Sequence, residues 1–169
     1  MEVIAETDRL LLRVFKETDV EAAMAFWGNQ EVMEHCLGAI PHNHLHKALA
    51  AYATCQKEKG LSMYAVVEKE SNRVIGAAGF NVRISSESVE LLYHFAKVAW
   101  GKGYATEAAA ACVKFAIENA KVKKIYASAD KGNAGSLKIL EKIGFENKGM
   151  KWFDDTKQKE PYFELNVKG

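Results

Sequence analysis

The stretch WGKGYATEA, residues 100–108, constrains the fold most, because it places two glycines between a strand-like run and a helical run. The apolar residues 89–98 precede it, and the alanine-rich residues 105–120 follow. The first N–H groups of a helix have no partner within the helix and lie at its positive end, where they attract an anion. Glycine lets such a backbone approach a phosphate closely. The stretch therefore predicts a strand, an anion-binding loop and a helix, with a phosphate-bearing ligand.

Length and composition indicate one soluble domain. The chain has 169 residues, of which 49% are hydrophobic and 27% charged, so we expect a single domain over residues 1–169. The net charge of +1 disfavours nucleic acid or an anionic membrane as partner, and no apolar run is long enough for a membrane span. Cys36, Cys55 and Cys112 are odd in number and widely spaced, which disfavours disulfides and a metal site. The acidic N-terminus is unlike a signal peptide, so a cytoplasmic location is expected.

Hydrophobic periodicity in the first half of the chain predicts one strand, two helices and three further strands. Thr18 and Glu21 have capping-box spacing, so the first helix is expected to begin after Thr18. Asn43 is expected to cap the second helix, which ends before Gly60, and residues 28–42 read as irregular. The predicted strands are residues 9–14, 63–68, 74–82 and 89–98, and the second helix is residues 43–59. The apolar character of residues 89–98 predicts a central strand.

The second half adds a helix over residues 105–120, a strand over 125–129, a helix over 135–143 closed by Gly144, and a strand pair over 145–153 and 162–167. Strands and helices do not alternate regularly along the chain. This order predicts an α/β fold with a mixed sheet, in the α+β sense, rather than a doubly wound fold.

Three kinds of phosphate-binding loop compete for residues 100–108. A dinucleotide fold requires Gly-x-Gly-x-x-Gly after the first strand, whereas Gly101 and Gly103 are followed by Ala105 and Thr106 late in the chain. A P-loop requires Gly-Lys-Ser/Thr, whereas Gly101-Lys102 is followed by Gly103. The third kind, a loop for the pyrophosphate of coenzyme A, remains.

The chain resembles the GNAT superfamily of N-acetyltransferases, in particular its RimJ/RimL-like branch, over nearly its whole length. Four segments in the right order carry the resemblance: TDRLLLR at residues 7–13, VIG at 74–76 followed by Gly79, WGKGYATEA at 100–108, and Asn133 and Ser136 with LEKIGF at 140–145. Trp100 departs from the Gln or Arg usual in the superfamily, but tryptophan is familiar in this branch. The resemblance implies a central, mostly antiparallel twisted sheet flanked by helices.

Acetyl-CoA is the implied co-substrate, with no metal. Its pantetheine arm would bond to backbone at Tyr93, His94 and Phe95 in a cleft between splayed strands. Its pyrophosphate would lie on the amides of the glycine loop, with Lys102 as an added charge. The implied cofactor-binding residues of the loop are Trp100, Gly101, Lys102, Gly103, Tyr104 and Ala105.

Acetyl transfer requires a neutral amine, so a base must remove a proton directly or through water. Glu90 is the candidate, since it occupies the strand position where parts of the superfamily place a base glutamate; the alternatives are an edge carboxylate or a group that binds a cationic substrate. The superfamily's tyrosine, which aids the leaving thiolate, corresponds to Leu140 here. Ser136, one turn earlier, is the alternative donor, or else a helix-terminus serine that satisfies the backbone. Asn133 is expected to hold pantetheine or to organise the turn into the helix. Tyr93 and Tyr126 are further hydroxyl candidates that are more often core residues.

Several alternatives remain open. The acceptor is either a protein N-terminal α-amine or a small amine, in a pocket built by residues 28–42 and 153–161. The protein is a monomer or a homodimer. The missing tyrosine at Leu140 motivates a non-catalytic acyl-CoA sensor as the second function, and a nucleotide-binding regulator is the third. His42, His44 and His46 are read as a substrate-side loop rather than a metal site, because only His42 and His46 would share a helix face.

Overall fold

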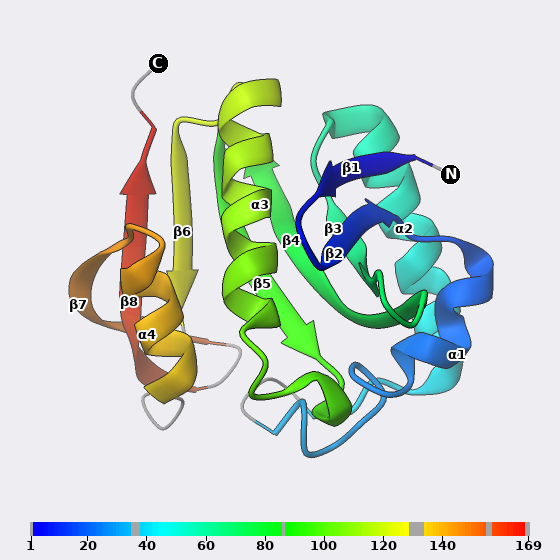
Figure 1. The fold of residues 1–169 in the computed structure, drawn as a ribbon. Helices are drawn as coiled ribbons and strands as arrows, with labels where there is room; N and C mark the ends of the chain where they lie inside the picture. The colour runs from blue at the N-terminus through cyan, green and yellow to red at the C-terminus, as the bar shows by residue number, and fades with distance from the viewer. Residues whose placement is uncertain (1, 35–37, 86, 129–133, 155–156, 168–169) are drawn as a thin grey trace.

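The computed structural model describes residues 2–34, 38–85, 87–128, 134–154 and 157–167, which form an eight-stranded sheet with helices on both faces (Figure 1). The strands are β1 (Val3–Glu6), β2 (Leu10–Val14), β3 (Met63–Glu68), β4 (Arg73–Ser85), β5 (Ser88–Phe95), β6 (Lys124–Ser128), β7 (Glu146–Phe153) and β8 (Gln158–Asn166). The helices are α1 (Val20–Ala23), α2 (His42–Lys59), α3 (Tyr104–Asn119) and α4 (Ala134–Lys142), with 3-10 turns η1 (Glu17–Asp19) and η2 (Lys97–Ala99). The mixed α/β fold expected from the sequence is confirmed.

The sheet contains one parallel pair at its centre. The strand order is β1-β2-β3-β4-β5-β6-β8-β7, and β5 and β6 run parallel whereas the other neighbours are antiparallel. Parallel neighbours need a crossover, which α3 supplies. The ladder pairs residues 88–90 with residues 124–126, and β5 then continues to Phe95 while β6 diverges from it (Figure 1). The predicted central position of this strand is confirmed.

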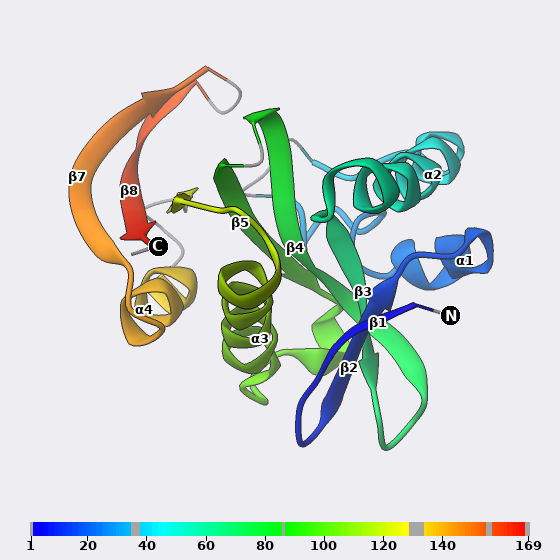
Figure 2. The same ribbon diagram turned by 90° about the horizontal axis from the view of Figure 1, so that it is seen from above.

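The two faces of the sheet bury separate cores. Helices α3 and α4 cover one face, and α1 and α2 cover the other (Figure 2). The α3 side includes the fully buried Tyr64 and Phe80, and the α2 side includes Phe26, Leu45 and Leu49. Each such side chain stabilises the fold by roughly 1.5–3 kcal/mol. The strands that carry the site are therefore held between two packed layers.

The strands differ from the prediction in several places: β4 runs on to Ser85, β8 begins already at Gln158, an additional strand β1 is present, and β5 ends early. Strand β1 was not expected, because residues 3–6 are few and partly exposed and give only a weak pattern. The strand predicted over residues 89–98 ends at Phe95, although the sequence stays apolar, because the chain turns into η2. There Ala99 N–H donates to the Ala96 carbonyl and Trp100 N–H to the Lys97 carbonyl. This turn directs the glycine loop toward the start of α3.

Both predicted N-terminal helix caps are wrong. Lys16 N–H donates to Asp19 Oδ2 at 2.7 Å, so Asp19 organises the first turn that was assigned to Thr18 and Glu21. Asp19 is chosen because it also forms a buried two-bond ion pair with Arg13, at 2.8 and 2.9 Å. The second helix begins at His42 after Pro41, whose fixed φ suits a helix start, rather than at Asn43. Its end at Gly60, with φ +77°, agrees with the prediction.

Candidate active site

The glycine loop has the geometry of an anion site. Gly101 and Gly103 have φ of +77° and +80°, in the left-handed region that favours glycine. Helix α3 starts directly after Gly103, which has no side chain to cap the first turn. The amides of Tyr104 and Ala105 are therefore first-turn groups at the positive end of a 16-residue helix.

A cleft of about 760 Å³ opens where this loop meets the splayed strands. It is lined by three groups of residues: Tyr93, His94 and Phe95 from β5; Ala99, Trp100, Gly101, Gly103, Tyr104, Ala105 and Thr106 around the loop; and Gly135, Ser136 and Ile139 from α4. Glu31, Val32 and Glu34, before α2, complete the lining. The structure thus brings most of the cofactor-binding residues expected from the sequence to one cleft, while Lys102 lies outside its lining and is exposed.

The backbone of β5 presents hydrogen-bonding groups at its open side. Ala96 N–H donates to the Ile75 carbonyl, next to β4. Because the groups of an antiparallel strand alternate in direction, those of His94 also point to β4, whereas those of Tyr93 and Phe95 point to the other side. The Phe95 carbonyl accepts a hydrogen bond of 2.8 Å from Trp100 Nε1, in accord with this direction. The backbone N–H and C=O groups of Tyr93 and Phe95 therefore form the open edge of β5.

Tyr93 and Ser136 meet across the cleft. The Tyr93 hydroxyl lies 2.7 Å from Ser136 Oγ and donates to the Ser136 carbonyl at 3.3 Å. Burial raises the pKa of Tyr93 to about 12, and the hydrogen bond with Ser136 opposes this increase. The phenol therefore keeps its proton at neutral pH and remains a hydrogen-bond donor.

His94 contributes its side chain on the opposite face of β5. Its Nδ1 accepts a hydrogen bond from Trp27 Nε1 at 3.1 Å. Burial lowers the pKa of His94 to about 4, so the imidazole is neutral at physiological pH. Trp27 is itself buried, with its ring packed against those of Phe15, Phe26 and Tyr52. His94 therefore lines the cleft as a neutral side chain held by Trp27.

Glu90 is buried three residues before Tyr93, on the face of β5 that also carries His94. It lies between Asn81 of β4 and Tyr126 of β6 in the sheet register. Its charge contributes to a raised pKa of Tyr162, after burial and the effects of Glu164 and Tyr126. Glu90 lies outside the lining of the cleft, three residues along β5 from Tyr93, the first lining residue of that strand.

The remaining sequence candidates fall in different environments. Leu140 is fully buried in the α3-side core, as is Cys112. Asn133 lies outside the described residues. His42 and His46 share a helix face, with ring centroids 5.3 Å apart, as predicted. Within the described residues, no group of three metal-ligating side chains is found, and no described helix is both long and apolar enough to cross a membrane.

Sequence reasoning missed the long-range contacts that organise the site. Tyr93 and Ser136 are 43 residues apart, and Arg9 of the β1–β2 turn contacts Glu107 of α3 across 98 residues. Arg9 and Glu107 both lie in segments that carry the family resemblance, so the sequence shows that both motifs are present. It does not show that the two side chains pair. Glu31 forms an ion pair with Lys97, which joins the segment before α2 to η2.

A glycine loop and a helix start at the open end of a splayed parallel strand pair form the arrangement expected of a site for a phosphate-bearing ligand. Comparison with known sequences specifies the class. The acetyltransferase (GNAT) domain family matches residues 9–146. The chain belongs to this family.

Relatives and solved structures agree with this assignment. An uncharacterized N-acetyltransferase, p20, of Bacillus licheniformis is 26% identical over 149 residues, which are 85% of this chain and 83% of that protein. A GNAT-family acetyltransferase from Bacillus anthracis has a TM-score of 0.85 at 23% identity, with 99% of each chain covered. RimL, a ribosomal L7/L12 alpha-N-protein acetyltransferase solved with coenzyme A, has a TM-score of 0.82 at 15% identity, with 98% of each chain covered. These structural likenesses show the GNAT fold.

Proposed function

We propose that the protein is an acetyl-CoA-dependent N-acetyltransferase that moves an acetyl group to a primary amine by direct attack in a ternary complex. The observation that carries this proposal is the cleft. It joins an open strand edge on β5, first-turn amides of α3 and the Tyr93–Ser136 hydroxyl pair. A cofactor with an amide-rich arm, a pyrophosphate and a terminal thioester matches these three features in that order.

Binding of the donor follows from the backbone. The pyrophosphate would lie on the amides of Gly103, Tyr104 and Ala105, where the helix dipole favours an anion. The pantetheine amides would pair with the cleft-facing groups of Tyr93 and Phe95 as an added strand. This arrangement brings the thioester toward Ser136 on α4.

The amine would attack from the side of His94 and Glu90. A thioester is an activated acyl donor, so holding the amine in line with the carbonyl supplies much of the acceleration. We propose that Glu90 removes the ammonium proton through a water chain, because it is buried three residues from the rim rather than on the cleft wall. The neutral His94 adds no positive charge that would repel an ammonium group.

The departing thiolate would meet the hydroxyl pair. The Tyr93 hydroxyl would turn from the Ser136 carbonyl to donate to Ser136 Oγ, and Ser136 would in turn donate to the sulfur. Leu140 occupies the position of the superfamily's tyrosine and is buried in the core. The hydroxyl pair would therefore stabilise the leaving thiolate in place of that tyrosine. Tyr93 then acts at the thiolate by way of Ser136.

The acceptor is proposed to be a protein N-terminal α-amine or a small-molecule amine. RimL, which shares the fold, is described as an alpha-N-protein acetyltransferase, and this favours the first. Glu31 and Glu34 at the cleft would favour a cationic amine of either kind. We further propose that the protein acts in the cytoplasm, as a monomer or homodimer.

The experiment is thiol release from acetyl-CoA with panels of small amines and peptides, followed by mass spectrometry of the acceptors. Transfer to any amine supports the proposal, and the preferred panel separates the acceptor classes. Tight binding of acetyl-CoA with no transfer to any member would instead indicate the non-catalytic acyl-CoA sensor that Leu140 suggests. Binding of ATP or NAD without affinity for coenzyme A would contradict both.

A further inference from the structure

We infer that Arg9, in the turn between β1 and β2, is a positioning residue that holds the glycine loop in its anion-binding shape. The inference rests on the proposed function, because it takes the loop as the pyrophosphate site. Arg9 Nη1 donates to the Lys102 carbonyl at 2.8 Å. Its Nε and Nη2 both lie 2.8 Å from Glu107 Oε1, in the first turn of α3. One guanidinium thus joins the middle of the loop to the helix that follows it.

The orientation of the Lys102 peptide is the consequence that matters for binding. A trans peptide is planar, and its C=O and N–H point in opposite directions. Holding the Lys102 carbonyl against Arg9 therefore turns the Gly103 N–H away from Arg9. Gly103 lines the cleft, so this N–H is directed at the place proposed for the pyrophosphate.

Glu107 keeps the guanidinium in place. It accepts hydrogen bonds from the Arg9 backbone N–H at 3.1 Å and from the Thr7 hydroxyl. Burial would raise the pKa of Glu107, but the hydrogen bonds from Thr7 and Arg9 outweigh it and lower the pKa, so the carboxylate stays charged. Thr7 Oγ1 also accepts from Leu10 N–H at 3.0 Å, which fixes the β1–β2 turn.

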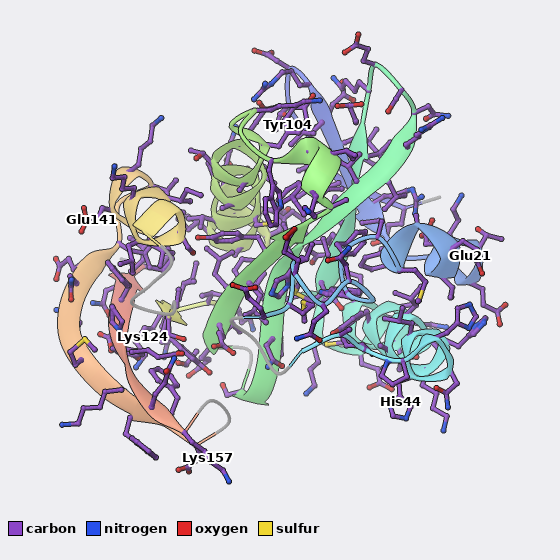
Figure 3. All side chains as sticks on the ribbon, turned by 90° about the horizontal axis from the view of Figure 1, so that it is seen from below. Glu21, His44, Tyr104, Lys124, Glu141 and Lys157 are labelled. Carbon is purple, nitrogen blue, oxygen red and sulfur yellow. The ribbon has the colours of Figure 1, made fainter. Side chains whose placement is uncertain are left out.

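The ring of Tyr104 forms the third point of attachment. The Arg9 guanidinium carbon lies 4.4 Å from the centroid of this buried ring, and the Tyr104 hydroxyl donates to Glu68 at 2.7 Å. Figure 3 shows Tyr104 beside the blue ribbon of the first strands. A loop with two left-handed glycines has many alternative conformations. Contacts at residues 102, 104 and 107 select one of them before the donor binds, which lowers the entropy lost on binding.

The test compares two acetyl donors. Acetyl-CoA carries the pyrophosphate, whereas S-acetylpantetheine lacks it. For Arg9→Gln we expect the KM for acetyl-CoA to rise roughly tenfold to a hundredfold, the value of one or two charge-assisted hydrogen bonds, with kcat and the acceptor KM nearly unchanged. Transfer from S-acetylpantetheine should be unaffected. Arg9→Lys should recover little, because an ammonium cannot bond the carbonyl and the carboxylate together.

Lys69→Gln is the control. It removes an exposed cation next to Arg9, whose carbonyl accepts from the Lys69 N–H at 2.9 Å. The Lys69 ammonium pairs with Glu6 at 2.7 Å, and its loss should leave both donors unaffected. Thermal melting checks that each variant folds. Equal loss with both donors, or no loss with either, would overturn the inference. If the wild type binds coenzyme A without transfer, the proposed activity fails, and the ratio of coenzyme A to pantetheine affinities then tests Arg9 by calorimetry. A wild type that does not bind coenzyme A would overturn both.

Discussion

The Tyr93–Ser136 pair makes a quantitative prediction about the leaving group. Tyr93→Phe keeps the ring in the cleft and removes the hydroxyl that lies 2.7 Å from Ser136 Oγ. With its pKa raised to about 12, the phenol is a much weaker acid than a thiol of pKa ~8.5. Complete proton transfer to the thiolate is then uphill by about 5 kcal/mol. We therefore expect the pair to stabilise the thiolate by hydrogen bonding rather than to protonate it fully.

The expected loss of kcat follows from hydrogen bonding to the thiolate without full proton transfer. A hydrogen bond to a charged group contributes about 1.5–3 kcal/mol, so kcat should fall roughly tenfold to a hundredfold in Tyr93→Phe. Ser136→Ala should show a similar loss. Because the two hydroxyls act as one unit, the double variant should lose little more than either single variant.

The assay is thiol release at saturating acetyl-CoA and acceptor between pH 7 and 10. The loss in Tyr93→Phe should be uniform over this range, since the phenol does not titrate there. Tyr52→Phe, which removes a phenol hydroxyl in the α2-side core, is the matched control and should retain kcat. A loss above about a thousandfold would indicate full proton transfer, and independent, multiplying losses in the double variant would refute the hydroxyl pair.

Three further predictions concern the base, the loop and the fold. Glu90→Gln should lower turnover by about a hundredfold near pH 7 and by less at high pH, where more of the amine is already neutral; an unchanged pH–rate profile would remove Glu90 as the base. Gly103→Ala should weaken coenzyme A binding in calorimetry, whereas Gly60→Ala, at nearly the same φ in open space, should cost the same backbone strain of about 1–2 kcal/mol without affecting the ligand; equal affinity in the two variants would contradict the loop assignment. Asp19→Ala leaves Arg13 buried without its partner, so urea unfolding should show a loss of about 3–5 kcal/mol at pH 7. Burial opposes the ionisation of Asp19, but the hydrogen bonds from Arg13 and Lys16 and the charges of these two residues together outweigh it and hold the pKa of Asp19 below the ordinary 3.8. Its stabilisation is therefore complete above that value and lost as pH falls through the lower, folded-state pKa, so the difference between wild type and variant should narrow in acid.

The sequence predicted the fold well where local patterns decide structure. The central strand, the glycine loop and the end of α2 at Gly60 all follow from periodicity and backbone preference. Prediction from the sequence failed where a contact with a residue on another element determines the local structure. Asp19, and not Thr18, organises the start of the first helix, because Arg13 of β2 pairs with it. A capping pattern in the sequence does not reveal a partner on another element.

The same distinction applies to the residues of the candidate site. The loop residues could be named from the sequence because their role depends on backbone geometry and adjacent elements. Tyr93 was a weak candidate until the fold placed Ser136 beside it. Arg9 lies in a segment that carries the family resemblance, but the sequence does not predict what it contacts. Its contacts to residues 102, 104 and 107 require the β1–β2 turn to lie against the start of α3.

The early end of the β5–β6 ladder also bears on solubility. Beyond residue 90, β5 offers an edge inside the sheet rather than at its margin. An exposed strand edge is a template for pairing with another chain, and proteins usually cover or charge such edges. In the proposed complex the pantetheine arm completes this edge as a missing strand would. The donor would then act as part of the architecture as well as a reactant, and its binding would stabilise the folded protein by mass action.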